Sequence, residues 1–388
     1  MRLTQQRCRF SDGNLGVDRP ALFIAQFAGD EPPYDNLDNI CRWAHELGFG
    51  GIQLPADRRF ISIADAAKSR GWCDDHVLAP MRQNGIAPTH IAAHLIGQLM
   101  AVNPAHYGLL DFCGPATLAG RPNMQWRWAQ REMMRVVDAS ANMDLKTVFA
   151  FPGNFCFPYV YPWPPRNETM VQAAFRELAR RWLPVLRYAE ERGIKIAFEV
   201  HPQEDVFDGP TWERFLEAVG NNPAAGIAYD PSHFILQGID PLEFLNTYYS
   251  RVFGAHWKDA EMKLHGPRQG VYGGLLPFAL RAGRFRSLGD GELDIKSMEN
   301  MLALHGLSLW RVLEWECVVK DKETGAREGA QIIQAAIDEK PLPKFPVPDV
   351  PTTQSFEKFA ASGGSRKVFE HCLGIRIPDA DAAELGLT

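Results

Sequence analysis

Short apolar runs alternate with longer amphipathic stretches along most of the chain. The short runs are rich in branched and aromatic residues, which is typical of buried strands. The stretches between them repeat apolar residues every three or four positions, which indicates helices that bury one face. The pattern predicts eight strands, at residues 21–27, 50–55, 86–96, 146–151, 194–200, 226–230, 252–257 and 310–317.

Helical periodicity fills the intervals between these strands. The predicted helices lie at 36–49, in parts of 62–85, and at 124–143, 168–193, 211–220, 241–249, 294–306 and 323–339. Strands that alternate with helices form parallel strand–helix–strand units, and eight units in series predict an α/β fold, a (β/α)8 TIM barrel. A doubly wound open sheet is the alternative, but no GxGxxG motif follows the first strand.

The end of the chain differs in composition from the barrel pattern. Residues 341–352, "PLPKFPVPDVPT", are rich in proline and predict an extended linker, and a short amphipathic tail follows. We therefore expect a barrel catalytic domain over 1–340 and a C-terminal extension over 341–388. The extension is expected to wrap the barrel or a neighbouring subunit of a homo-oligomer.

Composition narrows the class of protein. The 388 residues are 46% hydrophobic and 23% charged, which suits a globular protein with a substantial core. A net charge of −6 argues against sequence-independent nucleic-acid binding, which needs a basic face. The first residues lack the apolar segment of a signal peptide, and no apolar run approaches the length that spans a bilayer. The seven cysteines are scattered and never spaced as CxxC, which favours free thiols and a cytoplasmic location.

Residues that can carry chemistry stand at the ends of four successive strands. Reacting groups of a (β/α)8 barrel lie at the carboxyl ends of its strands. Strand five ends at Glu199, strand six at Asp230 and strand seven with His256, while the eighth carries Glu314. Buried acids that converge on one mouth need a positive partner. Three carboxylates and one imidazole favour a hard to borderline divalent cation, such as Mn²⁺, Mg²⁺ or Co²⁺.

Purely structural interpretations compete with this one. Asp230 and Pro231 suit the first turn of a helix, as an N-cap and a first helical residue. Glu316 lies two residues from Glu314 on the same strand face, so either could be the ligand, and the deeper Glu314 is favoured.

Four other polar residues near the strand ends have two interpretations each. His201 is either a partner of a ligand or an ordinary loop residue, and His233 either faces the mouth or lies on a helical turn. Lys258 could form a simple surface ion pair with Asp259, and His94 is as well explained by packing as by substrate contact.

Several short motifs, taken together, resemble a known group of proteins. The segments "FEVHP", "YDPSHFILQGIDP", "HWKDAE", "GDGELD" and "VLEWE" are similar to the xylose isomerase-like TIM barrel superfamily. Within it they resemble the sugar phosphate isomerase/epimerase branch, which includes ketose 3-epimerases and inosose isomerases and dehydratases. The resemblance covers roughly residues 20–340 and is strongest over 194–316.

The resemblance implies one divalent metal ion, with Mn²⁺ expected first and Mg²⁺, Co²⁺ or Zn²⁺ as alternatives. It implies that two of the ligands, both glutamates, also act as the acid/base pair. The ketose epimerases have an arginine shortly after the metal histidine, whereas this chain has Lys258, and Arg284 or Arg286 could substitute. The implied ligands are Glu199, Asp230, His256 and Glu314, with Glu199 and Glu314 catalytic, and the expected substrate contacts are His233, His201, Lys258, His94 and Arg286.

These residues predict an isomerase or epimerase that acts on a keto-sugar or cyclitol. A proton next to the carbonyl is removed, and the metal stabilises the enediolate. The same site supports a dehydratase or lyase that eliminates a β-hydroxyl or β-alkoxy group from a keto-sugar, including 3-keto-glycosides. Less favoured are an endonuclease IV-like DNA repair nuclease, which needs several zinc ions and a basic face, and a non-catalytic sugar- or partner-binding barrel.

Overall fold

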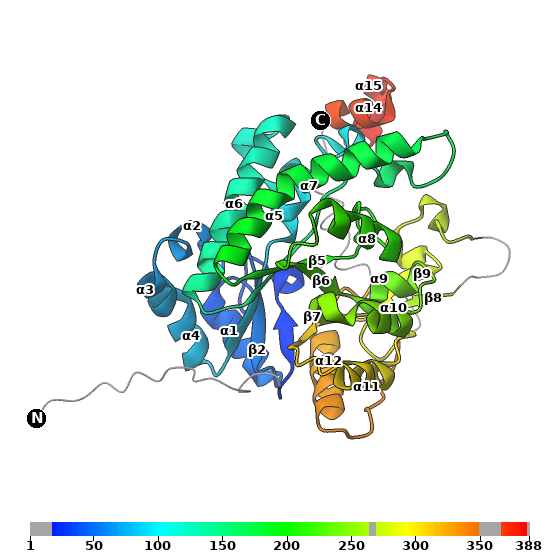
Figure 1. Cartoon of the computed structure of the whole chain (residues 1–388). Coiled ribbons are helices and arrows are strands. Elements are labelled where there is room, and N and C mark those ends of the chain that lie inside the picture. Colours follow the sequence, from blue (N-terminus) through cyan, green and yellow to red (C-terminus); the bar gives the residue numbers. More distant parts are fainter. Residues whose placement is uncertain (1–17, 264–268, 349–365, 386–388) are drawn as a thin grey trace, which may run out of the picture.

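Eight parallel strands close into a barrel in the computed structural model, which describes residues 18–263, 269–348 and 366–385. The last barrel strand pairs in parallel with both the first and the seventh, which closes the ring (Figure 1). The predicted (β/α)8 barrel is therefore confirmed. Around the ring the strands are β1 (Ala21–Phe23), β10 (Arg311–Leu313), β7 (Val252–Trp257), β6 (Ala225–Tyr229), β5 (Lys195–Glu199), β4 (Thr147–Ala150), β3 (Ala87–Ala92) and β2 (Gly51–Pro55).

Helices cover the outside of the barrel, and the two longest, α6 (Pro122–Asn142) and α7 (Glu168–Glu191), run side by side (Figure 1). The helical stretch predicted within 62–85 is confirmed as short pieces, α2 (Ile63–Ala66), α3 (Arg70–Cys73) and α4 (Ala79–Gln83), with a π-helical turn before α4. The other helices of the barrel are α1 (Leu37–Glu46), α5 (His94–Gln98), α8 (Gly209–Ala218), α9 (Pro231–Ile235), α10 (Pro241–Tyr248), α11 (Ile295–Leu304) and α12 (Lys322–Ile337).

The inside of the barrel is filled by small and aromatic side chains. Phe23 and Phe149 lie there among alanines of several strands and Val312, and all of these are buried. Gly254 on β7 makes room for Phe149, because a Cβ at this position would lie 2.4 Å from the ring. This packed apolar layer lies directly beneath the polar residues at the carboxyl ends of the strands.

Three predicted strands run four residues past the observed ends. The first ends at Phe23, and Ala25–Phe27 forms a 3-10 turn. The third ends at Ala92, and His94 begins α5, while the eighth ends at Leu313. In each case apolar residues continue past the last ladder pair because the loops around the mouth are themselves buried, so hydrophobicity alone does not mark where a strand ends.

The interval between the seventh and eighth predicted strands, for which the sequence pattern indicates an irregular loop over 259–293, contains regular structure. It contains an antiparallel pair of strands, β8 (Asp259–Met262) and β9 (Gly283–Arg286). Charged residues in these two strands interrupt the apolar alternation that marks a strand in the sequence. In the structure, charged residues of the two strands pair with one another. Glu261 on β8 lies 2.6 Å from both Arg284 and Arg286 on β9.

The described part of the C-terminal extension lies against the barrel. Leu342 and Phe345 pack on the main core, and the helices α14 (Arg366–Leu373) and α15 (Asp379–Glu384) follow. Val368 on α14 approaches Gly108, in the loop that follows β3. Residues 349–352 of the predicted linker lie outside the described residues, and the domain boundary at 340 stays a prediction.

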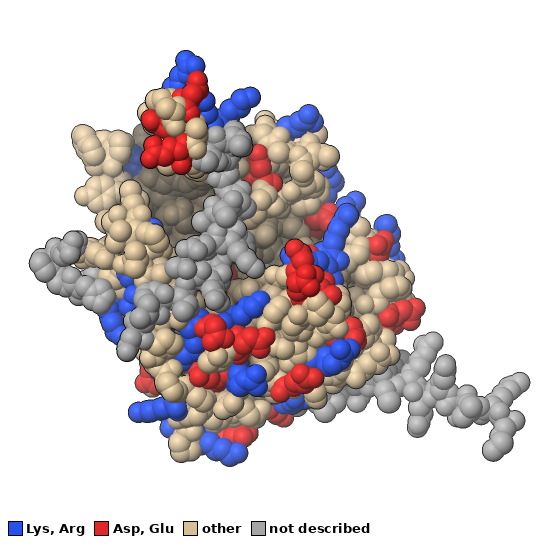
Figure 2. Space-filling view, turned by 180° about the vertical axis from the view of Figure 1, so that it is seen from behind, with Lys and Arg blue, Asp and Glu red and all other residues tan. Residues whose placement is uncertain are grey.

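Every helix in the described ranges is too short or too polar to cross a bilayer. The face seen in Figure 2 is hollowed, and lysine, arginine, aspartate and glutamate side chains are interspersed over much of the rest of it.

Candidate metal centre

The four predicted ligands come together at the carboxyl end of the barrel. One ligand atom from each of them lies within 4.8 Å of the ligand atoms of the others. All four side chains are buried, with 7% or less of each exposed. Adjacent strands of the ring supply them, which is why residues far apart in sequence meet: Glu199 from β5, Asp230 after β6, His256 from β7 and Glu314 after β10.

Glu199 is held by two imidazoles. Its Oε1 lies 2.9 Å from Nε2 of His233, and its Oε2 lies 2.9 Å from Nε2 of His94. Burial raises the pKa of Glu199, but the hydrogen bonds from the two histidines outweigh burial and hold the pKa well below its usual value. The carboxylate is therefore ionised and can either bind a cation or accept a proton.

Asp230 forms the corner between β6 and α9. Its Oδ1 accepts hydrogen bonds from the backbone N–H of Ser232, at 2.9 Å, and from the hydroxyl, at 2.7 Å. Pro231 occupies the first helical position, so both structural roles suggested by the sequence are observed. The cap uses only one carboxylate oxygen. The other, Oδ2, faces His233 at 3.1 Å and Lys258 at 3.5 Å.

The side chains of His256 and Glu314 contact each other directly within the ligand cluster. Nδ1 of His256 lies 2.8 Å from Oε2 of Glu314. The His256 ring is stacked between Phe23 and Phe149, which fixes its plane. Burial raises the pKa of Glu314, but nearby Lys258 and His256 outweigh burial, and the pKa lies below its usual value.

Three buried atoms of the cluster lack hydrogen-bond partners among the described residues. They are Oδ2 of Asp230, Nδ1 of His256 and Oε2 of Glu314. Buried polar atoms without partners cost free energy, so a group of them around one point indicates a ligand that completes their coordination. Oxygen and imidazole donors suit a divalent cation, and this donor set therefore fits the metal that the sequence predicts.

Lys258 also lies in the cluster. Its ammonium is 3.4 Å from Oε2 of Glu314 and 2.5 Å from Oε2 of Glu316. Burial lowers the pKa of Lys258, but the surrounding carboxylates, Glu314 foremost, raise it well above its usual value. The alternative of a simple surface pair with Asp259 is wrong, because Lys258 is 2% exposed and Asp259 accepts four backbone N–H groups instead.

His201 and His233 form a second group of potential ligands with Glu199. The two rings contact edge to face, with centroids 4.1 Å apart, and Nδ1 of His201 is buried without a partner among the described residues. Burial lowers the pKa of His233, but Asp230 and other partners raise it to about 9, so the ring is protonated at neutral pH. His94, His201, His233 and Lys258 thus lie at the ligand cluster, as the sequence predicts.

Arg286 lies on the β8–β9 arm, where its guanidinium is engaged by another residue. Nη1 of Arg286 is 2.6 Å from Oε2 of Glu261, which also binds Arg284 and Lys263. The structure therefore pairs Arg286 within the arm and shows no contact between it and the four described ligands.

Two glutamines that the sequence interpretation missed contact the ligands. Oε1 of Gln53 on β2 lies 2.8 Å from Nε2 of His256, and Nε2 of Gln26 donates to Oε1 of Glu314 at 2.8 Å. The signal in the sequence is a polar residue inside an apolar strand, as in "GIQLP", or just after one, as in "ALFIAQF". Such a residue in a barrel strand faces the interior or the mouth.

The aromatic loop after β4 is attached to the segment after β5. The carboxylate of Asp205 accepts the backbone N–H groups of Phe155, Cys156 and Phe157, at 2.7, 2.7 and 3.0 Å. The start of the loop reaches the cluster, because the ring of Phe151 lies 4.8 Å from those of both His94 and His201. Asp205 therefore ties one wall of the mouth to the strand that carries Glu199.

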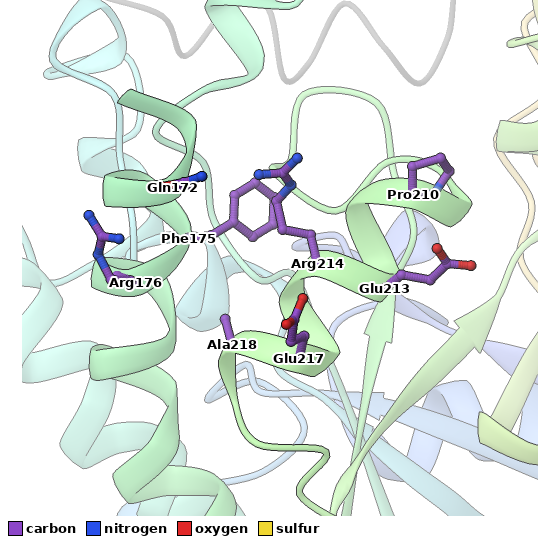
Figure 3. A pocket seen from close by; sticks show the side chains of 8 residues that line it. All are labelled: Gln172, Phe175, Arg176, Pro210, Glu213, Arg214, Glu217 and Ala218. Atoms are coloured by element: carbon purple, nitrogen blue, oxygen red, sulfur yellow. The ribbon is translucent and has the colours of Figure 1, made fainter. Parts of the chain in front are cut away.

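A separate groove of about 660 Å³ lies on the outer wall, between α7 and α8 (Figure 3). Arg214 points into it, lies over the ring of Phe175 and pairs with Glu168. None of the predicted site residues lines this groove. Its lining residues are Gln172, Phe175, Arg176, Pro210, Glu213, Arg214, Glu217 and Ala218.

Comparisons with known proteins agree with the observed fold. The model of the family described as xylose isomerase-like TIM barrel matches residues 41–336. An inosose dehydratase of Clostridium tetani is 25% identical over 142 residues, which are 37% of this chain and 47% of that protein. The chain spans about half the length of the curated relatives it matches.

Solved structures show the same fold at low identity. A 3-keto-D-glucoside 4-epimerase from E. coli has 13% identity and a TM-score of 0.54, covering 82% of this chain and 99% of that one. A xylose isomerase-like TIM barrel protein from Mycobacterium smegmatis, in complex with magnesium, has 13% identity and a TM-score of 0.54, covering 83% and 96%. Likeness at this level shows the fold alone.

Proposed function

The chain belongs to the xylose isomerase-like TIM barrel family, and we propose that it is a metal-dependent isomerase or epimerase of a keto-sugar or cyclitol. The observation that carries this proposal is the convergence of three carboxylates and one imidazole within 4.8 Å, where three buried side-chain atoms of these residues have no hydrogen-bond partner among the described residues. Glu199, Asp230, His256 and Glu314 would hold the ion. The two glutamates would also move the proton.

A bound divalent cation supplies Lewis acidity, which makes a proton next to a carbonyl easier to remove. Mn²⁺ is the ion that we expect first, with Mg²⁺, Co²⁺ and Zn²⁺ as alternatives, because the donors are mostly carboxylate oxygens. The magnesium in the Mycobacterium smegmatis neighbour supports a hard cation.

Glu199 and Glu314 approach the cluster from strands that lie three places apart in the ring, so they flank it from different sides. Both carboxylates are ionised and can accept a proton from the carbon next to the carbonyl. Returning the proton to the adjacent carbon gives an isomer, and delivery of a proton to the opposite face gives an epimer. A positioned acid or base of this kind contributes about 10²–10⁴-fold to the rate.

The flanking residues of the cluster would orient the substrate. His233, His201 and His94 offer ring N–H groups beside Glu199, and Lys258 offers an ammonium beside Glu314. These donors suit hydroxyl and carbonyl oxygens of a small polyol. Arg286 would join them only if its pairing with Glu261 changed.

A dehydratase or lyase is the second candidate, and the two protonated groups beside the carboxylates favour it. An elimination needs a base for the proton next to the carbonyl and an acid for the oxygen that leaves the β-carbon. His233 and Lys258 are both protonated at neutral pH and lie beside Asp230. Each also lies beside one glutamate, His233 at 2.9 Å from Glu199 and Lys258 at 3.4 Å from Glu314. The similarity to an inosose dehydratase is consistent with this chemistry.

Other classes have less support. A DNA repair nuclease needs a basic surface, and the face in Figure 2 carries charges of both signs, with a net charge of −6 for the chain. The cytoplasmic location and the homo-oligomer stay predictions.

Solvent exchange tests the proposal. Keto-sugars and cyclitols are incubated with the protein and Mn²⁺ in D₂O, and deuterium uptake is followed by mass spectrometry and NMR. An isomerase or epimerase incorporates deuterium next to the carbonyl, whereas a lyase releases water or an alcohol and forms an unsaturated ketone. Absence of exchange and of elimination with every compound would overturn the proposal.

Matched variants assign the roles within this experiment. Glu199→Gln and Glu314→Gln should each stay folded, lose most activity and bind metal more weakly. Glu217→Gln, an exposed change in the outer groove, serves as the control and should behave as the unmodified protein. Normal turnover by either site variant would contradict the assignment.

A further inference from the structure

Gln53 contacts the His256 imidazole at the ring nitrogen that does not face Glu314. Its side chain is fully buried, and its carboxamide oxygen is 2.8 Å from Nε2 of His256. The opposite nitrogen, Nδ1, faces Glu314 and has no hydrogen-bond partner among the described residues. One ring nitrogen thus points to the protein and the other to the cluster.

A neutral imidazole carries its proton on one nitrogen and a lone pair on the other. A carboxamide oxygen can only accept, so the His256 nitrogen that faces Gln53 must carry the proton. The lone pair then stands on Nδ1, the atom among the predicted ligands. A histidine that binds metal commonly donates its second N–H in this way, which fixes both tautomer and ring orientation.

We propose that Gln53 is a positioning residue, which holds His256 as the Nε2–H tautomer and so presents the Nδ1 lone pair to the metal. The inference rests on the proposed function, because it assumes that His256 is a ligand. Gln53 acts through His256 and touches neither the metal nor the substrate.

The choice of an amide over a carboxylate follows from the charge of the cluster. Four carboxylates lie close together, those of Glu199, Asp230, Glu314 and Glu316, and Lys258 and the protonated His233 supply the positive charge among them. An aspartate or glutamate behind His256 would accept the same hydrogen bond but would add another buried negative charge. A glutamine fixes the tautomer without that electrostatic cost.

Gln26 performs a comparable task for Glu314. Its Nε2 donates to Oε1 of Glu314 at 2.8 Å, and the remaining oxygen, Oε2, is the one that faces Nδ1 of His256. Gln26 can orient the carboxylate but cannot select a tautomer, because a carboxylate has none. The two glutamines therefore differ in what their removal should do.

The affinity for Mn²⁺, measured by titration calorimetry and by electron paramagnetic resonance of free Mn²⁺, tests the proposal without turnover. Gln53→Met keeps the length of the side chain and removes the acceptor, and its affinity should fall about 10- to 100-fold. Gln53→Glu restores the acceptor and should recover at least the original affinity. Gln125→Met, which removes a buried glutamine of α6 that contacts Asp111, is the matched control and should leave affinity unchanged.

NMR of the unmodified protein provides a readout that does not depend on the folding of a variant. In the Zn²⁺ complex of protein labelled with ¹⁵N at histidine, one imidazole should show a slowly exchanging Nε2–H and a metal-shifted Nδ1. That signal should be lost in Gln53→Met.

The outcomes separate the two proposals. If the unmodified protein binds no divalent metal, the proposed function fails. If it binds metal but Gln53→Met keeps full affinity, or if the metal-shifted nitrogen is Nε2, only the role of Gln53 is overturned. A drop in affinity that Gln53→Glu does not recover, with both variants folded by circular dichroism, would also overturn it.

Discussion

Nζ of Lys258 lies 2.5 Å from Oε2 of Glu316, closer than it lies to either Asp230 or Glu314. This pair answers a question that the sequence leaves open, because Glu314 and Glu316 stand two residues apart after the same strand. Glu314 contributes an oxygen to the four-residue cluster, whereas Glu316 is turned to the ammonium. Lys258 thus pairs most closely with Glu316, and Glu314 is the glutamate whose oxygen belongs to the cluster.

We expect Lys258→Met to bind divalent metal more tightly, by about tenfold or more. The ammonium repels a cation at the cluster, and two unit charges a few ångströms apart interact by several kcal/mol even at an effective dielectric constant of about 20. Activity should fall, because a donor to substrate is lost. Titration calorimetry with Mn²⁺ measures the first effect.

The control for this variant is Lys258→Met combined with Glu316→Gln, which leaves no unpaired carboxylate behind. A weaker affinity for metal in both variants would show that Lys258 supports the ligands more than it repels the ion.

Removal of metal with a chelator should lower the melting temperature by a few degrees. Without a cation, the carboxylates of Glu199, Asp230 and Glu314 repel each other at close range. A ligand at a hundredfold excess over its Kd stabilises a folded protein by about 2.7 kcal/mol. Calorimetry with and without added Mn²⁺ measures the shift. No shift in the unmodified protein, or an equal shift in Glu314→Gln, would contradict a specific site.

Asp205→Asn should loosen the aromatic loop after β4. The carboxylate accepts three backbone N–H groups, and an amide oxygen can replace only part of this pattern, since the amide nitrogen opposes the remaining N–H. Hydrogen exchange at Phe155 to Phe157 should become at least about tenfold faster. Asp208→Asn is the control, because asparagine caps a helix as well as aspartate does, and it should leave these amides unchanged.

Glu261→Gln should destabilise the protein at neutral pH by about 2–4 kcal/mol, because three cationic side chains lose their carboxylate. Burial raises the pKa of Glu261, but its three partners lower it to about 2. A pKa below the unfolded value means that the stabilisation is present above about pH 4.5 and is lost as pH falls through 2.

Chemical denaturation between pH 7 and pH 2 tests this dependence. The difference between unmodified protein and Glu261→Gln should shrink as the pH drops below about 4.5. A difference that stays constant over the range would contradict the ionic origin of the effect.

The sequence predicts both the barrel and the convergence of the four candidate ligands, because both depend on the same regularity. Apolar strands end at a polar residue in parallel barrels, and Glu199 and Asp230 stand at such ends. The position of the His94 ring beside Glu199 could not be predicted from the strand pattern alone. It follows β3 as the first residue of a short helix, and only the helical turn brings its ring to Glu199.

Contacts between distant charged residues could not be predicted. The β8–β9 arm is held by Glu261 and two arginines more than 20 residues away, and neither strand shows an apolar alternation. The contacts of Gln53 and Gln26 with the candidate ligands could not be predicted from the sequence either. A single polar residue inside a strand or just after one has no evident partner in the sequence. Its role becomes visible only when barrel closure pairs β1 with β10 and brings β2 within reach of β7.

The closing contact of the barrel sets the order of events during synthesis. β1 pairs with β10, whose strand is the last of the ring to be made, and Glu314 follows it directly. A nascent chain that has not yet reached this point has the glutamines of the first strands and three ligands, but not the fourth. If these four residues hold a metal ion, as we propose, the complete site exists only once β10 has joined the ring, and occupancy by metal would report that both ends of the barrel have met.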